Sequence, residues 1–501
     1  MSDKALLTTL FKGDSKLKGD SKRSDVFLNL IDGAWTAGAA TIENRNPSDT
    51  SDLIGHFVSA SAEDVTRAAS AAEAASNRWF ADGPQPRADL LGRIADMIDA
   101  RATEIGTMLA REEGKVINEA IAETKRAAQT FRFYAGEALR IPGEALASVR
   151  PGVDVEILRE PVGVVGLITP WNFPIAIPAW KIAPALAYGN TVVFKPADLT
   201  PGTAHLLAEI IHEAGAPPGV FNLVMGSGRV VGNAIVEDPL INAISFTGSV
   251  PTGHEIGRSA IARMKKIQLE MGGKNPMVVM DDADISLAVS VCLNGAFFST
   301  GQRCTASSRF IVQSGIHDVF VKELGRQMQD LRVGHALDSS SQIGPVASAS
   351  QLESNLGYVA LAKDEGCDVV GGQRVDAATD GFFQAPALFV NASSEMRVSQ
   401  EEIFGPCASI IRVETLDEAI HVANDTTFGL SSGICTTSLR NAREFKHRSR
   451  AGVVATNLPT AGLDYHVPFG GTKGSSFGSR EQGRFAVEFY TTVKTSYSFA
   501  G

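Results

Sequence analysis

"VGVVGLITPWNFPIAIPAWKIAPALAYGNTVVFKPAD", residues 162–198, is the stretch that decides the fold. It holds two short apolar runs, VGVVGLI and TVVF, on either side of a segment with helical spacing. Short apolar runs that end at a turn are typical of strands buried on both faces. The stretch therefore predicts a strand, a helix and a second strand of a parallel sheet that helices cover on both sides.

The same alternation continues downstream. An amphipathic helix is predicted over TPGTAHLLAEIIHEAG (200–215), directly after the opening stretch. Two further strands are predicted after this helix, over VFNLVMG (220–226) and INAISFTGS (241–249). Ligands of such sheets bind beyond the carboxyl ends of the strands. The residues at those ends are 170–174, 195–198, 226–228 and 247–249.

Three further regions flank this series. Helices dominate from about residue 60, beginning with a cap at Ser61, and 143–154 is rich in breakers. A second α/β series begins at KNPMVVMDDAD (274–284) and runs to about residue 470. The segment GRFAVEFYTTVKTSYSF (483–499) alternates like an exposed strand, and such a terminal strand often pairs with another subunit.

Composition excludes several classes of protein. The chain has 501 residues, 44% of them hydrophobic, and a net charge of -10, which argues against binding to nucleic acid. Its five cysteines show no CxxC spacing, so neither a disulfide framework nor a zinc site is expected. No apolar run approaches the roughly 20 residues of a membrane span, and no secretory apolar segment opens the chain. A reducing cytoplasm is the expected location.

One cysteine, Cys304, lies in the polar stretch STGQRCTASSR (299–309). It is either a half-buried thiol or a nucleophile. A nucleophile needs a base and a donor for the oxyanion that forms on a carbonyl substrate. Glu270 in LEMGGKNP (269–276) follows an apolar strand, where burial would raise its proton affinity, and Asn172 in TPWNFP (169–174) could donate to an oxyanion. Each signal alone is also compatible with a structural role.

The strand ends also suggest a cofactor site. GSGRVVG (226–232) has the spacing GxGxxxG and so does not meet the dinucleotide fingerprint GxGxxG. FTGS (246–249) offers backbone N–H groups at a helix N-terminus, where an anion is stabilised. In KPAD, Lys195 could donate to ribose hydroxyls, and Asp198 would accept from a 2′-hydroxyl and repel a 2′-phosphate. NAD is therefore favoured over NADP.

Several short blocks follow one another along the chain: PWNFP, KPAD, FTGS, LEMGGKNP, GQRC, EEIFGP (401–406) and PFGG with K (468–473). In sequence and in order they resemble the signature blocks of the NAD(P)-dependent aldehyde dehydrogenase superfamily. The resemblance extends over the chain from about residue 26 onward. The resemblance implies that Cys304 attacks an aldehyde, that Asn172 binds the oxyanion, and that Glu270 activates the water that hydrolyses the thioester. No metal is implied. Glu402 and Phe404 would hold the nicotinamide ribose and ring. The full expected set for NAD or NADP is Thr169, Pro170, Trp171, Lys195, Asp198, Gly228, Gly232, Phe246, Thr247, Gly248, Ser249, Glu402 and Phe404.

The segments GQRCTASSR, NLPTAGLDYHVPFGG (457–471) and SSFGSREQGRFAVEFYTT (475–492) resemble the α-ketoglutaric semialdehyde (2,5-dioxovalerate) dehydrogenase branch. This implies oxidation of α-ketoglutaric semialdehyde to 2-oxoglutarate. The alternatives are succinic semialdehyde or another short aldehyde, an acyl-CoA-forming reaction, and a non-catalytic protein of the same fold.

A substrate of this kind ends in a carboxylate, which needs a cation. Arg303 is the local candidate, and a structural salt bridge is its alternative role. The substrate residues are expected to be Phe173, Trp180, Arg303, Thr305, His466 and Phe469, with the loop 459–466 at the mouth.

The resemblance also implies an α/β fold in three parts. These are a Rossmann-like NAD(P)-binding domain (26–142 and 159–271), a catalytic α/β domain (272–474) and a small β oligomerisation arm (143–158 and 475–501). A homodimer or homotetramer is expected. Residues 1–25, in which KGDSK occurs twice, are expected to form a mobile tail.

Overall fold

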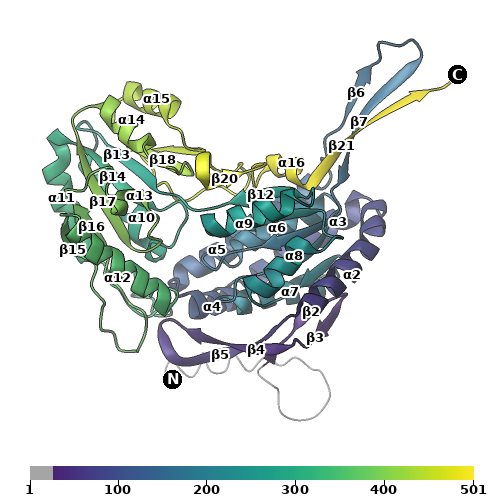
Figure 1. Ribbon diagram of the computed structural model, residues 1–501, viewed down its shortest axis with the longest axis horizontal. Coiled ribbons are helices and arrows are strands. Elements are labelled where there is room, and N and C mark those ends of the chain that lie inside the picture. Colours follow the sequence, from purple (N-terminus) through teal and green to yellow (C-terminus); the bar gives the residue numbers. More distant parts are fainter. Residues whose placement is uncertain (1–25) are drawn as a thin grey trace.

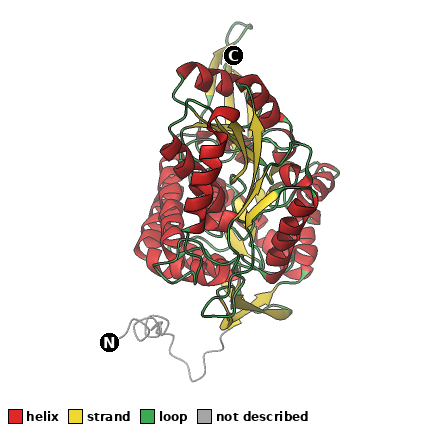
Figure 2. Ribbon diagram, turned by 90° about the vertical axis from the view of Figure 1, so that its left-hand side faces the viewer, coloured by secondary structure: helices red, strands yellow, loops and turns green. Residues whose placement is uncertain are grey.

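The computed structural model describes residues 26–501, so the expected tail lies outside the described residues. Two α/β units lie beside each other, and a three-stranded arm projects from them (Figure 1). In the view turned by 90°, the strands run through the middle with helices on both sides (Figure 2). The predicted α/β class is confirmed. None of the helices between residues 26 and 501 combines the length and apolar composition that crossing a membrane requires.

The first unit is built on an eight-stranded sheet. Its strands, in spatial order, are β20 (Ser476–Phe477), β12 (Lys266–Glu270), β11 (Ala243–Thr247), β8 (Val164–Ile168), β9 (Thr191–Lys195), β10 (Phe221–Leu223), β2 (Asn29–Ile31) and β3 (Ala34–Thr36). The five strands from β12 to β10 are parallel, as the sequence predicted. The chain runs outward from β8 to β10 and then returns to place β11 on the other side of β8. Ligands bind at such a switch point.

Helices cover both faces of this sheet. Side chains of β8 alternate, with Val165 and Leu167 in one core and Val164 and Ile168 in the other. The first core includes α3 (Pro84–Ala100), α4 (Ala102–Glu113), α5 (Ile117–Glu137), α6 (Ala176–Ala187) and α7 (Pro201–Glu213). The second includes α2 (Ala62–Ala81), the π-helix η1 (Gly228–Gly232), α8 (Asn233–Glu237) and α9 (Val250–Ile261). Ser61 caps α2 in a capping box with Asp64, as expected.

The second unit has a seven-stranded sheet. Its strands, in spatial order, are β15 (Asp368–Gly371), β16 (Ala387–Val390), β17 (Cys407–Val413), β14 (Ser307–Gln313), β13 (Asn275–Val279), β18 (Ser431–Cys435) and β19 (Val453–Thr456). All neighbours are parallel except β15 and β16. Its helices are α10 (Ile285–Phe297), α11 (Ser314–Gln329), α12 (Ala349–Asp364), α13 (Arg397–Gln400), α14 (Leu416–Asn424) and α15 (Leu439–Arg448).

The arm consists of β6 (Glu144–Ala147), β7 (Val153–Pro161) and β21 (Thr491–Phe499). The prediction of one strand over 483–499 is wrong in its first half. Residues 484–490 form the short helices η4 (Arg484–Ala486) and α16 (Val487–Tyr490), because Phe489 and Tyr490 are buried in the core of the first unit. Residues 476–490 thus lie on the first unit, where β20 pairs with β12.

A separate small sheet of β1 (Val26–Phe27), β5 (Asp49–Ser59) and β4 (Ala40–Asn46) was not expected from the sequence. It lies beneath the two units (Figure 1). The turn between β4 and β5 reaches the second unit, where the Thr50 N–H donates to the Asp380 carbonyl and the Phe382 N–H donates to the Pro47 carbonyl. The sheet therefore connects the two units at one end.

Candidate active site

Cys304 follows a backbone segment of unusual conformation. The 3-10 turn η2 (Phe298–Gly301) comes directly after α10, and Ser299, Thr300 and Gly301 have φ of 51°, 55° and 65°. Non-glycine residues rarely occupy this left-handed region, and they do so mainly where the surrounding structure enforces it. A Cβ on Gly301 would lie 2.2 Å from the Gly405 carbonyl oxygen, so the turn is pressed against the loop after α13. This turn presents Cys304 at a half-buried position.

Asn172 lies against the same segment. Its Nδ2 donates to the Gln302 carbonyl at 2.9 Å, two residues before the cysteine. The buried Lys115 fixes the Asn172 backbone, since its Nζ donates to the Asn172 carbonyl at 2.7 Å and to Glu123 at 2.6 Å. The turn after β8 and the Cys304 segment are therefore held together.

Glu270 ends β12 and is 2% exposed. Burial, together with the charge of Glu481, raises the pKa of Glu270 well above its ordinary value. The Ser476 Oγ donates a hydrogen bond to Glu270 Oε2 at 2.5 Å. Burial and the charges of Glu402 and Glu270 raise the pKa of Cys304 to about 12. The structure thus brings the three residues expected to be catalytic into one region.

The residues expected to bind the cofactor lie around the switch point of the first sheet. They follow β8, β9, β10, β11 and α13 in turn. Lys195 Nζ donates to Asp198 at 3.2 Å. The rings of Trp171 and Phe404 pack edge to face, with their centres 5.4 Å apart. Glu402 accepts from the Gly273 N–H at 2.8 Å.

Two buried hydroxyl groups lie at the switch point of the first sheet. Among residues 26–501, the Thr169 and Thr247 hydroxyls have no hydrogen-bond partner, and they lie at the ends of the neighbouring strands β8 and β11. Such orphaned polar groups require a ligand or water. A Cβ on Gly272 would lie 2.0 Å from Glu402 Oε2, so a side chain there would displace the Glu402 carboxylate. Gly228 and Gly232 bound the π-helix η1, and a Cβ on Gly228 would meet nothing.

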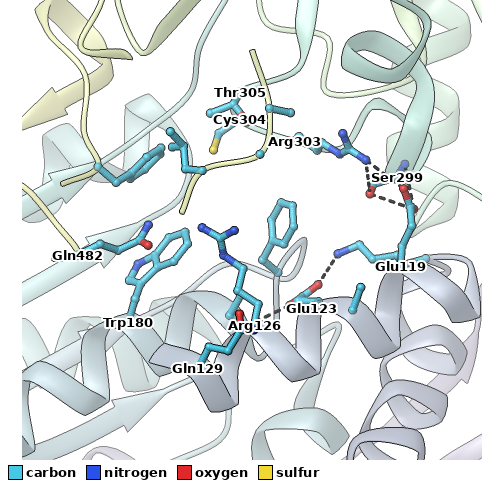
Figure 3. A pocket seen from close by; sticks show the side chains of 18 of the residues that line it. Glu119, Glu123, Arg126, Gln129, Trp180, Ser299, Arg303, Cys304, Thr305 and Gln482 are labelled. Carbon is cyan, nitrogen blue, oxygen red and sulfur yellow. Dashed lines mark hydrogen bonds and ion pairs between the residues drawn. The ribbon is translucent and has the colours of Figure 1, made fainter. Parts of the chain in front are cut away.

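A cavity of about 400 Å³ opens beside Cys304 (Figure 3). Of the expected substrate residues, Phe173, Trp180, Arg303, Thr305 and Phe469 line it. His466 is not among the lining residues, and the loop 459–466 contributes residues 461–463 instead. Helix α5 forms the opposite wall (Figure 3).

Arg303 is paired with a carboxylate of the protein itself. Its Nη2 donates to Glu119 and to Ser299 Oγ, each at 3.0 Å, and its side chain is 12% exposed. Of the two roles that the sequence left open, this geometry favours the structural salt bridge, because the guanidinium is already matched by the charge of Glu119.

Sequence reasoning did not identify Arg126 and Gln129 of α5 or Gln482, which also line the cavity. It also missed Lys115 and Glu123, which hold the turn that carries Asn172. No local signal marks Arg126 or Gln129, because polar residues on an amphipathic helix usually face solvent.

Comparison with known proteins is consistent with this site. A model of the aldehyde dehydrogenase family matches residues 35–496. The α-ketoglutaric semialdehyde dehydrogenase of Bacillus subtilis is 43% identical over 94% of this chain and 98% of its own. The α-ketoglutarate semialdehyde dehydrogenase of Haloferax volcanii is 40% identical over 95% of this chain and 99% of its own. The crystal structure of Staphylococcus aureus betaine aldehyde dehydrogenase in complex with NAD+ is 34% identical, with a TM-score of 0.92 over 95% of each chain.

Proposed function

This chain belongs to the aldehyde dehydrogenase family, and from that premise we propose that it oxidises α-ketoglutaric semialdehyde (2,5-dioxopentanoate) to 2-oxoglutarate with NAD+ or NADP+. One observation carries the choice of substrate. The relatives named for this semialdehyde match nearly the whole chain at 40–43% identity, including the segments that line the cavity beside Cys304. Succinic semialdehyde and other short aldehydes are the alternative substrates.

Cys304 is the proposed nucleophile. The thiol releases its proton to water as its sulfur bonds to the aldehyde carbon, and the carbonyl oxygen becomes an oxyanion. This adduct becomes the Cys304 thioester when hydride leaves the former aldehyde carbon. The Asn172 amide carries two N–H groups, of which one donates to Gln302, so the second is available for the oxyanion. The Cys304 N–H is the proposed second donor.

The nicotinamide cofactor supplies the hydride acceptor. Lys195 and Asp198 are proposed to bind the adenosine ribose, and Glu402 and Phe404 the nicotinamide ribose and ring. The Asp198 side chain is 38% exposed and forms an ion pair with the buried Lys195. A 2′-phosphate would meet this carboxylate, so we infer a preference for NAD+ over NADP+.

Glu270 is the proposed base of the second half-reaction. It accepts a proton from the water that attacks the Cys304 thioester, and the carboxylic acid leaves. An acyl-CoA-forming enzyme would use a thiol in place of this water. The retained glutamate favours hydrolysis, and analysis of the product with and without coenzyme A separates the two reactions.

We also propose that the chain forms a homodimer or homotetramer through the arm. One face of the arm sheet carries apolar side chains of β21 that residues 26–501 leave exposed. Val493, Tyr497 and Phe499 of β21 are 59%, 61% and 68% exposed, and they lie opposite Arg159, Val155 and Val153 of β7. Such a surface is usually covered by a partner.

The test is a panel of kcat/KM values for α-ketoglutaric semialdehyde, succinic semialdehyde and pentanal with NAD+ and with NADP+. The highest value is expected for α-ketoglutaric semialdehyde with NAD+. A higher value for succinic semialdehyde or pentanal would contradict the proposed substrate. In the same assay Cys304→Ala is expected to abolish turnover while NAD+ titration still shows binding.

A further inference from the structure

The cavity beside Cys304 contains a cation without a partner. Arg126 of α5 lines the cavity, and across residues 26–501 its guanidinium makes neither a hydrogen bond nor an ion pair. The two other cationic side chains of the cavity are occupied, Lys115 by Glu123 and Arg303 by Glu119. Figure 3 shows Arg126 reaching from α5 into the cavity, toward the side on which Cys304 lies.

The carboxylates near Arg126 do not satisfy it. Both oxygens of Glu123 are engaged, Oε2 by Lys115 and Oε1 by the N–H groups of Ile175 and Ala176. Asp464, in the loop at the cavity mouth, is exposed and forms no ion pair with Arg126. Burial lowers the pKa of Arg126, yet an arginine remains charged at neutral pH. A partly buried charge of this kind is stabilised by an anion that enters the cavity.

Gln482 lies in the same cavity with an unsatisfied amide. It is 1% exposed, and neither its Nε2 nor its Oε1 has a hydrogen-bond partner in the part of the chain that the structure describes. Its backbone is in the left-handed region, with φ of 58°, so the chain holds this side chain in place at a conformational cost. The indole N–H of Trp180, also on the cavity wall, is a second unpartnered donor. Buried donors of this kind are normally paired, and a polar substrate would pair them.

We propose that Arg126 binds the carboxylate of the substrate and that Gln482 donates to its 2-oxo group while the aldehyde reaches Cys304. This inference rests on the proposed function and deepens it, since 2,5-dioxopentanoate carries a carboxylate and a ketone at one end and an aldehyde at the other. The apolar rings of Phe173 and Phe469 also line the cavity and suit the carbon chain that joins the two ends. Arg126 then takes the role for which Arg303, the neighbour of Cys304 in sequence, was the first candidate.

Three aldehydes of five carbons test the Arg126 contact and the Gln482 contact independently. 2,5-Dioxopentanoate has both groups, 5-oxopentanoate lacks the ketone, and pentanal lacks the ketone and the carboxylate. Arg126→Met is expected to lower kcat/KM about 100-fold for both carboxylates and to leave pentanal within about threefold. Gln482→Met is expected to lower kcat/KM about tenfold for 2,5-dioxopentanoate alone.

Two control variants accompany these. Arg132→Met removes an arginine of the same helix whose partner, Asp96, lies on the surface, and all three kcat/KM values are expected to persist. Arg126→Lys keeps the charge but not the two-pronged geometry, and a loss of about tenfold is expected for the carboxylates only. It also serves if Arg126→Met fails to fold, which thermal unfolding and NAD+ titration would reveal.

The outcomes distinguish this inference from the proposed function. A wild-type enzyme that oxidises pentanal as efficiently as 2,5-dioxopentanoate overturns the proposed substrate and with it the role of Arg126. A second outcome is that the wild-type enzyme prefers the carboxylates and that Arg126→Met and Arg126→Lys keep this preference. This outcome overturns the role of Arg126 and leaves the proposed substrate standing. In that case Arg303→Met is expected to lose the preference. Equal losses for all three aldehydes in Arg126→Met also overturn the proposal, since they indicate a structural role.

Discussion

Burial and the charges of Glu402 and Glu270 raise the pKa of Cys304 to about 12, which favours the neutral thiol before the substrate binds. The attacking species is the thiolate, so the proton must leave as the carbon–sulfur bond forms. Burial and the charge of Glu481 likewise raise the pKa of Glu270. The region therefore tolerates little negative charge before the substrate arrives, and donors aimed at the oxyanion have a correspondingly large effect.

The raised pKa of Glu270 sets the expected pH dependence of turnover. A general base works only when ionised, so kcat should be lost as the pH falls through this raised pKa, at a higher pH than for an ordinary carboxyl with a pKa of 4.5. Glu270→Gln is expected to remove this acidic limb and to lower kcat about 100-fold while a burst of NADH persists. Stopped-flow measurements across a pH series check this. An unchanged limb in the variant would assign the titration to another group.

Gly470 leaves space for the Glu270 carboxylate. It has φ of 149°, and an added Cβ would lie 2.7 Å from Glu270 Oε1 and 2.7 Å from Arg480 Nη1. Gly470→Ala is therefore expected to displace the carboxylate and lower kcat at least tenfold while the Kd for NAD+ stays the same. The control is Gly92→Ala in α3, where a Cβ meets nothing within 4 Å and kcat should persist. Normal kcat in Gly470→Ala would show that Glu270 adjusts freely.

At the scale of elements, the site depends on how α5 is joined to the turn after β8. Lys115 precedes α5, is 2% exposed, and connects Glu123 of that helix to the Asn172 carbonyl. Its Nζ also lies 4.0 Å from the centre of the Phe173 ring. One buried lysine thus positions the proposed oxyanion donor and one wall of the cavity relative to α5.

Removing this lysine is expected to destabilise the protein strongly. Lys115→Met leaves the Glu123 carboxylate buried without its cation, which typically costs about 3–5 kcal/mol in the free energy of unfolding. Arg132→Met breaks an ion pair of the same helix whose side chains are 52% and 75% exposed, and the expected loss is below about 1 kcal/mol. Urea unfolding of both variants measures the difference. Similar losses would indicate that Glu123 is satisfied by other donors.

Sequence patterns predicted a strand or helix correctly where the spacing of apolar residues fits only one of the two. The runs that became β8, β9 and β11 are apolar on both faces, which matches a covered parallel sheet and little else. In FAVEFY (485–490) the large side chains fit two periods, since Phe485 and Phe489 are also spaced for a helix. Packing against the first unit selected the helix there, and such long-range contacts cannot be read from a local pattern.

The residues of the site likewise fall into those that a local sequence pattern predicted and those that it did not. Cys304, Asn172 and Glu270 stand in compact blocks whose order along the chain is informative, and the fold brings those blocks together. Arg126 stands in an ordinary amphipathic helix, so its place in the cavity follows only from how α5 packs against α6. Arg303 was favoured by its adjacency to Cys304, whereas its side chain turns to Glu119.

At the scale of the whole molecule, the arm presents apolar side chains that residues 26–501 leave exposed. Leu146 of β6 lies opposite Val155, so three strands contribute to the same face. The other face carries Asp154, Glu156 and Lys494 and is suited to water. This asymmetry is the basis of the proposed assembly.

Charges on the apolar face are expected to prevent assembly. Val493→Arg combined with Tyr497→Arg should lower the molar mass measured by light scattering to that of a smaller oligomer or monomer, because buried arginines would face an apolar partner. Ser498→Arg places the same charge on the opposite face of β21 and should leave the mass unchanged. A double variant of unchanged mass would exclude this face as the interface.

The proposed recognition groups of the cavity come from α5 and the segment at Gln482, whereas the proposed nucleophile follows the turn after α10. Reactivity and selectivity are therefore encoded in separate stretches of the gene. After duplication, a copy could acquire a new aldehyde preference through one codon change at position 126 without passing through an inactive ancestor. We expect directed evolution of this enzyme toward uncharged aldehydes to find its first gains on α5.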